Sequence, residues 1–262
     1  MYKYRFDQNV FHYELDLEHI DSSYVPLQIE CSFCFIRECY EYLEKNKLSF
    51  LSDIEINNLN KYDFRKKRHD YLLGRAAVKS ILLKKQLKIR DLSILNKVTG
   101  KPFINFDKLS VSISHSDNSA CAVTYSNLLE LAIDMEYIIN VENNTNFHFC
   151  SSNEESLFLK QSHALNNQII ILINWCSKES LAKFIGTGFN IVYEILEIEA
   201  IREIDKNILS ICYKNIKSAK TIVLIFTHFI ISITIPYSLN IKNIKSFFEY
   251  FCEYYSNSSS LL

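Results

Sequence analysis

Hydrophobic and polar positions along the chain predict a mixture of helices and strands. Apolar residues recur at helical spacing in residues 63–86, 167–184 and 242–255, and a further helix is expected to begin near Ser152. Alternating or continuous apolar runs predict strands at residues 111–115, 120–125, 128–135, 191–198, 208–213 and 221–235. No self-repeat and no long linker is evident. The pattern leaves open whether the 262 residues form one large domain or two ordinary ones.

Glycine is scarce, so its few positions are informative. The four glycines are Gly74, Gly100, Gly186 and Gly188. A chain that uses so few is expected to keep them where the backbone takes a positive φ or approaches a neighbour closely. Gly100-Lys101-Pro102 predicts a turn, and Gly186 is expected to end the helix of residues 167–184.

Composition narrows the class of protein. Hydrophobic residues make up 48% of the chain and charged residues 23%, which is typical of a globular protein with a buried core. The formal net charge is -1, so we expect neither nucleic acid nor a membrane surface as a partner. Residues 1–7 carry charges where a secretion signal needs an apolar run. The apolar run of residues 221–235 is shorter than the roughly 20 residues of a membrane-spanning helix.

Cysteine usage fits a cytoplasmic protein. The chain has 8 cysteines and no secretion signal, so reduced thiols are expected rather than disulfides. Cys31 and Cys34 have the spacing of zinc ligands, but no second Cys or His pair completes a tetrahedral set. We therefore expect both to be buried structural thiols.

Two carboxylates are expected to lie on one side of a strand. Asp134 and Glu136 are two positions apart, and side chains at that spacing point to the same face of a strand. Carboxylates held so close repel one another unless a cation lies between them, and oxygen ligands suit magnesium. A strand that becomes polar as it leaves the core would show the same residues, so the pair alone does not define a site.

A charged face on a buried helix strengthens the case. Trp175, Glu179 and Lys183 are separated by four positions, which places an indole, a carboxylate and an ammonium on one helical face. The apolar run of residues 169–173 indicates that this helix is largely buried. A surface Glu-Lys pair has the same spacing. On a buried helix, however, charged groups need partners, and a metal held by a third carboxylate supplies one.

Other polar groups are positioned to meet an anion. Ser114 and His115 end a predicted strand, where side chains can project from a sheet edge. Lys101 lies on the rigid turn between Gly100 and Pro102. The cations at residues 61–68 fit a helix edge that also includes Arg75, although most runs of this kind are exposed helix faces.

Taken in order, these elements resemble the surfactin-type 4'-phosphopantetheinyl transferases. The resemblance is carried by Tyr71-Leu-Leu-Gly-Arg75, Gly100-Lys-Pro102, Ser112-Ile-Ser-His115-Ser116, Ala132-Ile-Asp134-Met-Glu136 and Trp175-Cys-Ser-Lys-Glu179-Ser-Leu-Ala-Lys183, followed by Gly186 and Gly188. It covers roughly residues 50–190. The chain departs from the family pattern in two places: Ala132 precedes the metal pair where many relatives have glycine, and Asp70 stands where some relatives place a phosphate-binding arginine.

The resemblance implies a fold and a division of labour. The expected fold is α/β, of the α+β kind, with two similar subdomains related by pseudo-twofold symmetry, each a small antiparallel sheet packed with helices. Residues 1–130 would form the subdomain that contacts coenzyme A phosphates, and residues 131–262 the subdomain with the metal and the catalytic helix. Coenzyme A and Mg²⁺ would bind between the two, in a monomeric protein.

The resemblance also assigns roles to individual residues. Asp134, Glu136 and Glu179 would hold Mg²⁺. Lys101, Ser114 and His115 would contact coenzyme A phosphates, together with Arg68 or Arg75. Lys183 would steady the pyrophosphate and protonate the departing group.

The expected reaction is transfer of the phosphopantetheine arm from coenzyme A to a serine of an apo carrier protein of fatty-acid, polyketide or nonribosomal-peptide synthesis. Glu179, or a water that it orients, would take the serine proton. Two other classes stay open: a catalytically silent scaffold that binds carrier domains, and a different magnesium-dependent enzyme that acts on a nucleotide.

Overall fold

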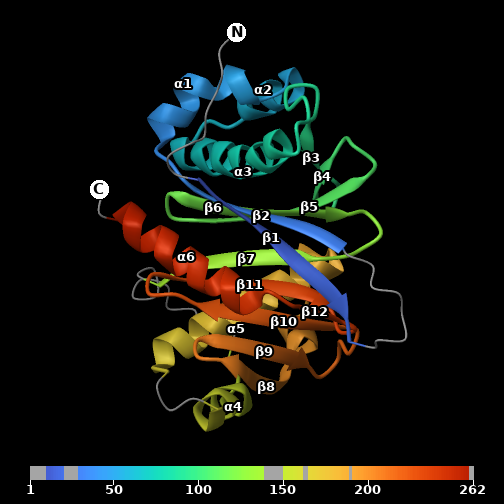
Figure 1. The fold of residues 1–262 in the computed structure, drawn as a ribbon, viewed down its shortest axis with the longest axis vertical. Coiled ribbons are helices and arrows are strands. Elements are labelled where there is room, and N and C mark those ends of the chain that lie inside the picture. Colours follow the sequence, from blue (N-terminus) through green and yellow to red (C-terminus); the bar gives the residue numbers. More distant parts are fainter. Residues whose placement is uncertain (1–9, 21–28, 139–149, 162–164, 189–190, 260–262) are drawn as a thin grey trace. The chain divides into compact units, whose positions relative to one another are not determined.

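The structure is a computed structural model that describes residues 10–20, 29–138, 150–161, 165–188 and 191–259. The chain forms two compact units. Unit 1 comprises Met1–Asp16, Ile29–Leu129 and Glu249–Leu262, and unit 2 comprises Leu17–Gln28 and Glu130–Phe248. The fold is α+β, because each unit contains an antiparallel sheet packed against helices (Figure 1).

Unit 1 is built around one long helix that lies on a sheet. Its strands β1, β2, β6 and β5 belong to a five-stranded sheet of order β12-β1-β2-β6-β5. The fifth strand, β12, lies in unit 2 and pairs with the Leu17–His19 end of β1, which also lies in unit 2. Helix α3 packs on β6, β2 and β5, and α1 and α2 pack on α3 (Figure 1). The elements are β1 (Val10–His19), β2 (Ile29–Arg37), α1 (Tyr40–Phe50), α2 (Asp53–Leu59), α3 (Arg65–Lys84), β3 (Ile94–Asn96), β4 (Pro102–Ile104), β5 (Leu109–Ser116) and β6 (Ser119–Ser126).

Unit 2 repeats this plan. Its sheet has the order β7-β11-β10-β9-β8, and α5 packs on β11, β7 and β10 while α4 contacts α5 and β8. The elements are β7 (Ala132–Tyr137), α4 (Ser152–Gln161), α5 (Asn167–Ile185), the 3-10 turn η4 (Tyr193–Leu196), β8 (Ile198–Asp205), β9 (Ile208–Tyr213), β10 (Ala219–Ile225), β11 (Phe229–Pro236), β12 (Leu239–Ile241) and α6 (Ile244–Ser259), of which α6 continues into unit 1.

A buried glutamate anchors three elements in unit 1. Ser52 caps α2 in a capping box: the Ser52 Oγ accepts the Glu55 N–H at 3.3 Å, and the Glu55 Oε2 accepts the Ser52 N–H at 2.8 Å. The Lys79 ammonium of α3 lies 2.8 Å from the same Oε2, and the Ile94 N–H of β3 donates to Oε1 at 2.8 Å. We call Ser52, Glu55, Lys79 and Ile94 the Glu55 anchor.

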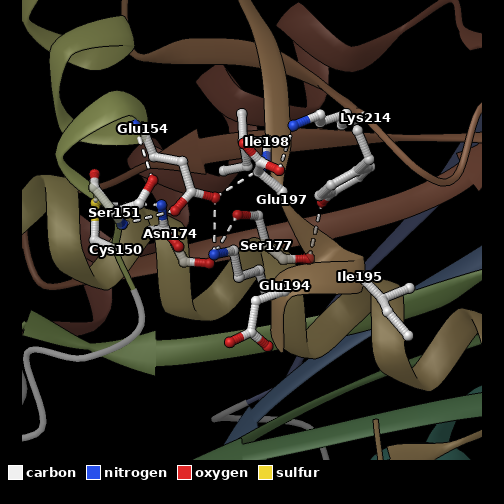
Figure 2. A network of polar contacts seen from close by, with 12 residues as sticks. Cys150, Ser151, Glu154, Asn174, Ser177, Glu194, Ile195, Glu197, Ile198 and Lys214 are labelled. Carbon is white, nitrogen blue, oxygen red and sulfur yellow. Dashed lines mark hydrogen bonds and ion pairs between the residues drawn. The ribbon is translucent and has the colours of Figure 1, made fainter. Parts of the chain in front are cut away.

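Unit 2 contains the same arrangement. The Ser151 N–H donates to Glu154 Oε2 at 2.8 Å, and the Ser151 Oγ accepts the Glu154 N–H at 3.2 Å. The Lys178 ammonium of α5 and the Ile198 N–H of β8 lie 2.8 and 2.9 Å from Glu154 Oε1. Figure 2 shows the carboxylate of Glu154 directed at Ser151 and Ile198. These four residues form the Glu154 anchor.

The two anchors reveal an internal repeat that the sequence pattern did not show. Ser, Glu and Lys recur in unit 2 at a constant offset from their counterparts in unit 1. Each glutamate joins a short helix, the long helix and the strand that follows it. We therefore align α2 with α4 and α3 with α5. The preceding strands, β2 and β7, also correspond, because each pairs with the second strand of a hairpin that follows the long helix.

The sparse glycines have clear structural reasons. A Cβ at Gly74 would lie 3.0 Å from the Cγ2 of Ile113, so glycine lets α3 approach β5 closely. Gly186 has a φ of 83° and ends α5 in a left-handed cap, with the Thr187 N–H donating to the Ala182 carbonyl at 3.2 Å. The predicted end of this helix is confirmed.

Three predicted strands are wrong in their limits. Residues 193–196 form η4 rather than strand, because the Ile195 N–H donates back to the Val192 carbonyl at 3.0 Å. Residues 221–235 divide into β10 and β11 at a turn closed by the Phe226 N–H and the Phe229 carbonyl. The stretch of residues 128–135 begins as a turn, so the strand starts at Ala132.

The helix limits also differ from the predictions. Helix α3 begins at Arg65, and Phe64 is its exposed N-cap rather than part of its apolar stripe. Helix α6 reaches Ser259, so residues 256–259 are helical rather than a loose tail. Residues 1–7 and 260–262, on which further predictions fall, lie outside the described residues. Strands β1 and β2 were not predicted.

The structure describes all eight cysteines. All eight cysteines are free thiols. Cys31 and Cys34 are fully buried, as expected of structural thiols, and residues three apart on a strand point to opposite faces. Among the described helices, none combines the length and the apolar character that crossing a membrane requires.

Candidate active site

Helix α5 presents a polar face to β7 within unit 2. The helix begins at an Asn166 cap, whose side chain accepts the Ile169 N–H at 2.9 Å, and its apolar residues pack on β11 and β7. The predicted common face of Trp175, Glu179 and Lys183 agrees with the contacts that Trp175 and Lys183 make with β7 and with the effect of the Asp134 charge on Glu179. The Trp175 Nε1 donates to Glu136 Oε1 at 2.8 Å, and the Lys183 ammonium lies 2.6 Å from Asp134 Oδ1.

The two carboxylates of β7 lie on the side that faces α5, as predicted. Asp134 pairs with Ser232 of β11 and Glu136 pairs with Ile230, so the two are on the same face of the strand. Asp134 is only 3% exposed and Glu179 only 6% exposed. Charged groups so deeply buried require compensation, which the Lys183 ammonium provides for Asp134.

Electrostatic crowding shows that the three carboxyl groups share one environment. Burial, followed by the charge of Asp134 and a small contribution from Glu179, raises the pKa of Glu136 to about 8, against the opposing effects of the Trp175 hydrogen bond and Lys183. Burial, followed by the charge of Asp134, raises the pKa of Glu179 to about 7, against the opposing effect of Lys183. The charge of Asp134 therefore disfavours ionisation of both Glu136 and Glu179, which is the condition that a bound cation relieves.

The chemistry of these donors fits Mg²⁺, although their positions are not those of a formed metal site. Three carboxyl groups offer the oxygen ligands that magnesium prefers. In the described part of the chain, no three His, Cys, Asp or Glu side chains are gathered as metal ligands. The cation beside Asp134 is instead the ammonium of Lys183, which also donates to the Ile133 carbonyl at 3.3 Å. Lys183 thus stands where the charge of a metal would act.

An aromatic pair covers one end of this face. Tyr193 of η4 stacks on Trp175, with ring centroids 6.2 Å apart and planes 25° from parallel. Burial raises the pKa of Tyr193, and the charge of Glu179 adds to the effect. Sequence reasoning missed Tyr193 because it placed this residue in a strand.

Unit 1 has uncharged residues at the corresponding positions. Ser80 follows Lys79 as Glu179 follows Lys178. On β2, Cys34 and Ile36 belong to the core that α3 covers, and they correspond to Asp134 and Glu136 on β7. Burial raises the pKa of the Cys34 thiol, with a smaller opposing effect from its hydrogen bond with Ser80. The two units therefore share one arrangement of helix and strands, but only unit 2 has carboxyl groups at these three positions.

The predicted phosphate ligands lie in unit 1. Lys101 is partly buried in the turn that precedes β4, and β4 contacts β5. Ser114 and His115 are consecutive on β5, so their side chains point to opposite faces: Ser114 is buried and His115 is exposed.

The two predicted arginines are engaged inside unit 1. Arg68 is paired with Glu44 at 2.8 Å, and it donates to the Tyr40 hydroxyl at 3.2 Å and the Leu59 carbonyl at 3.0 Å. Arg75 is buried, with its guanidinium 3.8 Å from the centre of the Tyr71 ring and a hydrogen bond of 3.2 Å to the Ile94 carbonyl. The buried Nε of Arg75 has no hydrogen-bond partner among the described residues.

Sequence reasoning gave no role to the Glu154 anchor, which joins α5 to α4 and β8. A recognisable signal was present, because Ser-x-x-Glu marks a capped helix start and occurs before both long helices. In comparisons with known proteins, no family model matches the chain and no curated protein matches it.

Proposed function

We propose that the protein is a magnesium-dependent 4'-phosphopantetheinyl transferase, which moves the phosphopantetheine arm of coenzyme A to a serine of an apo carrier protein. The observation that carries the proposal is the difference between the two units. Unit 2 places Asp134, Glu136 and Glu179 where unit 1 has Cys34, Ile36 and Ser80. Since the framework forms without these carboxylates, a role outside folding accounts for them.

The metal ligands of this proposal are Asp134 and Glu136 of β7 and Glu179 of α5. When bound there, Mg²⁺ neutralises charge on the pyrophosphate of coenzyme A and stabilises the oxygens of the displaced group. When coenzyme A binds, the Lys183 ammonium leaves its ion pair with Asp134 and pairs with an oxygen of the pyrophosphate instead. The Lys183 side chain is 29% exposed, so such a ligand can reach it, and its ammonium is proposed to protonate the departing phosphate.

The reaction is a displacement at phosphorus. The serine Oγ of the carrier attacks the phosphorus next to the pantetheine arm, a new O–P bond forms, and the bond to the bridging oxygen breaks to release adenosine 3',5'-bisphosphate. The serine proton passes to Glu179 or to a water that Glu179 orients.

Lys101, Ser114 and His115 are proposed to contact the phosphates of coenzyme A, which is a role carried over from the resemblance. The assignment of Arg68 or Arg75 to a phosphate stays a prediction. It requires the guanidinium to exchange its partners in unit 1 for the ligand. Among the two, Arg75 has a buried Nε that is not hydrogen bonded in the described structure. We propose a cytoplasmic monomer.

A mass assay tests the proposed function. The protein is incubated with coenzyme A, Mg²⁺ and a panel of apo carriers from fatty-acid, polyketide and nonribosomal-peptide synthesis, and each carrier is weighed. The expected result is a gain of one phosphopantetheine on at least one carrier, which is lost when a chelator removes Mg²⁺. Carrier binding without a gain of mass would favour the scaffold, and turnover of a nucleotide without a carrier would favour another magnesium enzyme.

A further inference from the structure

Lys178, which precedes Glu179 on α5, is held by an ion pair with α4 rather than by β7. Lys178 is 3% exposed, and its ammonium is paired with Glu154 at 2.8 Å. Glu154 is itself fixed, because its two oxygens accept the backbone N–H groups of Ser151 and Ile198. The pair therefore joins α5 to the start of α4 and to the first residue of β8.

We propose that Lys178 is a positioning residue: its ion pair with Glu154 sets the rotation of α5 about its own axis, and thereby aims Glu179 at Asp134 and Glu136. The inference rests on the proposed function, since it concerns the same carboxylates and the metal that they would hold. It adds a role for Lys178 and Glu154, neither of which contacts the ligand.

Helix geometry links the two neighbours. Successive residues of an α-helix are about 100° apart around the axis, so fixing the direction of one side chain fixes that of the next. A second contact supports the same rotation, because the Tyr213 hydroxyl donates to the Ser177 carbonyl at 3.0 Å. With Lys178 directed at Glu154, the following residue faces β7. A lysine that lost its buried partner would move toward water and carry the helix with it.

A direct catalytic role for Lys178 fits the geometry less well. Its side chain is only 4% exposed and its ammonium already serves a carboxylate, whereas the Lys183 side chain is 29% exposed and lies beside Asp134. Lys183 is therefore the cation that can reach a phosphate, and Lys178 acts through the position of its neighbour.

Unit 1 provides a matched control inside the same molecule. Lys79 and Glu55 make the same buried pair, with both side chains 0% exposed. The residue after Lys79 is Ser80, which hydrogen bonds with His12 at 2.9 Å and carries no charge. Breaking the Lys79–Glu55 pair should disturb α3 as much as breaking the Lys178–Glu154 pair disturbs α5. It should not, however, move any of the proposed metal ligands.

The experiment compares Lys178→Met with Lys79→Met in the full-length protein. Mn²⁺ alone is titrated and followed by calorimetry and by the fluorescence of Trp175, the only tryptophan, which hydrogen bonds with Glu136. Urea unfolding measures stability. We expect both variants to unfold at lower urea, but only Lys178→Met to bind Mn²⁺ about tenfold more weakly or worse, since supporting residues affect metal affinity by this order. Lys178→Arg, which keeps a cation beside Glu154, should restore most of the affinity.

Equal Mn²⁺ affinity in Lys178→Met and the unaltered protein would overturn the inference, as would an equal loss in Lys79→Met. If Lys178→Met does not fold, Glu154→Gln replaces it and Glu55→Gln becomes its control, because glutamine keeps the helix cap in both. The mass assay is read separately. An unaltered protein that binds Mn²⁺ but modifies no carrier contradicts the proposed function, while the comparison of the variants still decides the role of Lys178.

Discussion

The two units are built on one plan but differ in charge at one place. In both, the glutamate of a capping box pairs with a lysine of the long helix and accepts the first N–H of the following strand. Beyond the anchors, unit 1 fills the space between helix and strand with Cys34, Ile36 and Ser80, and unit 2 fills it with three carboxyl groups. We therefore infer that the two anchors stabilise the fold, whereas the three carboxyl groups of unit 2 do not.

The directions of the pKa shifts agree with this distinction between the anchors and the three carboxyl groups. Each anchor glutamate is surrounded by donors, and the pKa of Glu154 is lowered because the hydrogen bonds from Ile198, Lys178 and Ser151 outweigh burial. By contrast, the pKa values of Glu136 and Glu179 are raised by burial and by neighbouring carboxylates. A raised pKa means that the charged form of these carboxyl groups destabilises the folded state. Such groups are characteristic of functional sites.

The largest expected effect is on the anchor of unit 1. Lys79→Met should lower the free energy of unfolding by about 3 to 5 kcal/mol, because it leaves Glu55 buried without its counter-ion. Urea denaturation measures the loss, with the exposed Lys66→Met as the control. A loss as small as that of the control would show that the anchor does not belong to the fold.

The next effect is on transfer. Glu179→Ala should reduce the rate of carrier modification by about a hundredfold or more, while the protein keeps its fold, because the change removes a side chain that we propose as both metal ligand and base. The corresponding Ser80→Ala in unit 1 should leave the rate unchanged. Carrier modification at the normal rate in Glu179→Ala would refute the metal assignment.

A smaller effect of opposite sign is expected for Glu136→Gln. The amide oxygen still accepts the Trp175 N–H, but the variant removes one of three crowded carboxyl groups. We expect the free energy of unfolding at neutral pH to rise by about 1 kcal/mol while transfer falls. Thermal unfolding without added metal measures it beside the exposed Glu249→Gln. A clear loss of stability would mean that the charge serves the fold.

The smallest effect concerns His12 of unit 1, whose ring hydrogen bonds with Ser80. Burial, together with the charge of Lys84, lowers the pKa of His12 to about 4 from its ordinary 6.5. Between these values the unfolded chain binds a proton that the folded chain does not, so stability is lost as the pH falls from 6.5 toward 4. His12 is partly exposed, so the contribution is at most about 1 kcal/mol.

His12→Gln should flatten the dependence of stability on pH in that window. Urea unfolding at several pH values between 4 and 6.5 measures the slope. An unchanged slope would show that a charged His12 is tolerated beside Ser80, which would remove one difference between the two units.

The sequence predicted the parts of the site that depend on local spacing. The common face of Trp175, Glu179 and Lys183 follows from helical periodicity, and the shared side of Asp134 and Glu136 follows from strand alternation. The end of α5 at Gly186 follows from the scarcity of glycine. These features need only a few neighbouring residues.

Features that depend on distant contacts were not predicted. The family resemblance implied two similar subdomains, but the repeat within the sequence itself was not recognised. Its constant positions are a few polar residues, whereas the apolar residues around them are exchanged freely, as Leu59 is for Phe158. The pairing of Lys183 with Asp134 was also missed, because local spacing does not show which groups from distant segments meet. Strands β1 and β2 belong to a sheet whose other strands lie far along the chain.

The most direct test exchanges the charged residues for their uncharged counterparts. The variant Asp134→Cys, Glu136→Ile and Glu179→Ser gives unit 2 the residues of unit 1, and Mn²⁺ is titrated into this variant and into the unaltered protein under reducing conditions. The account predicts that both fold, that the unaltered protein binds one Mn²⁺ and that the variant binds none. Failure of the unaltered protein to bind Mn²⁺, or equal binding by the folded variant, would contradict it.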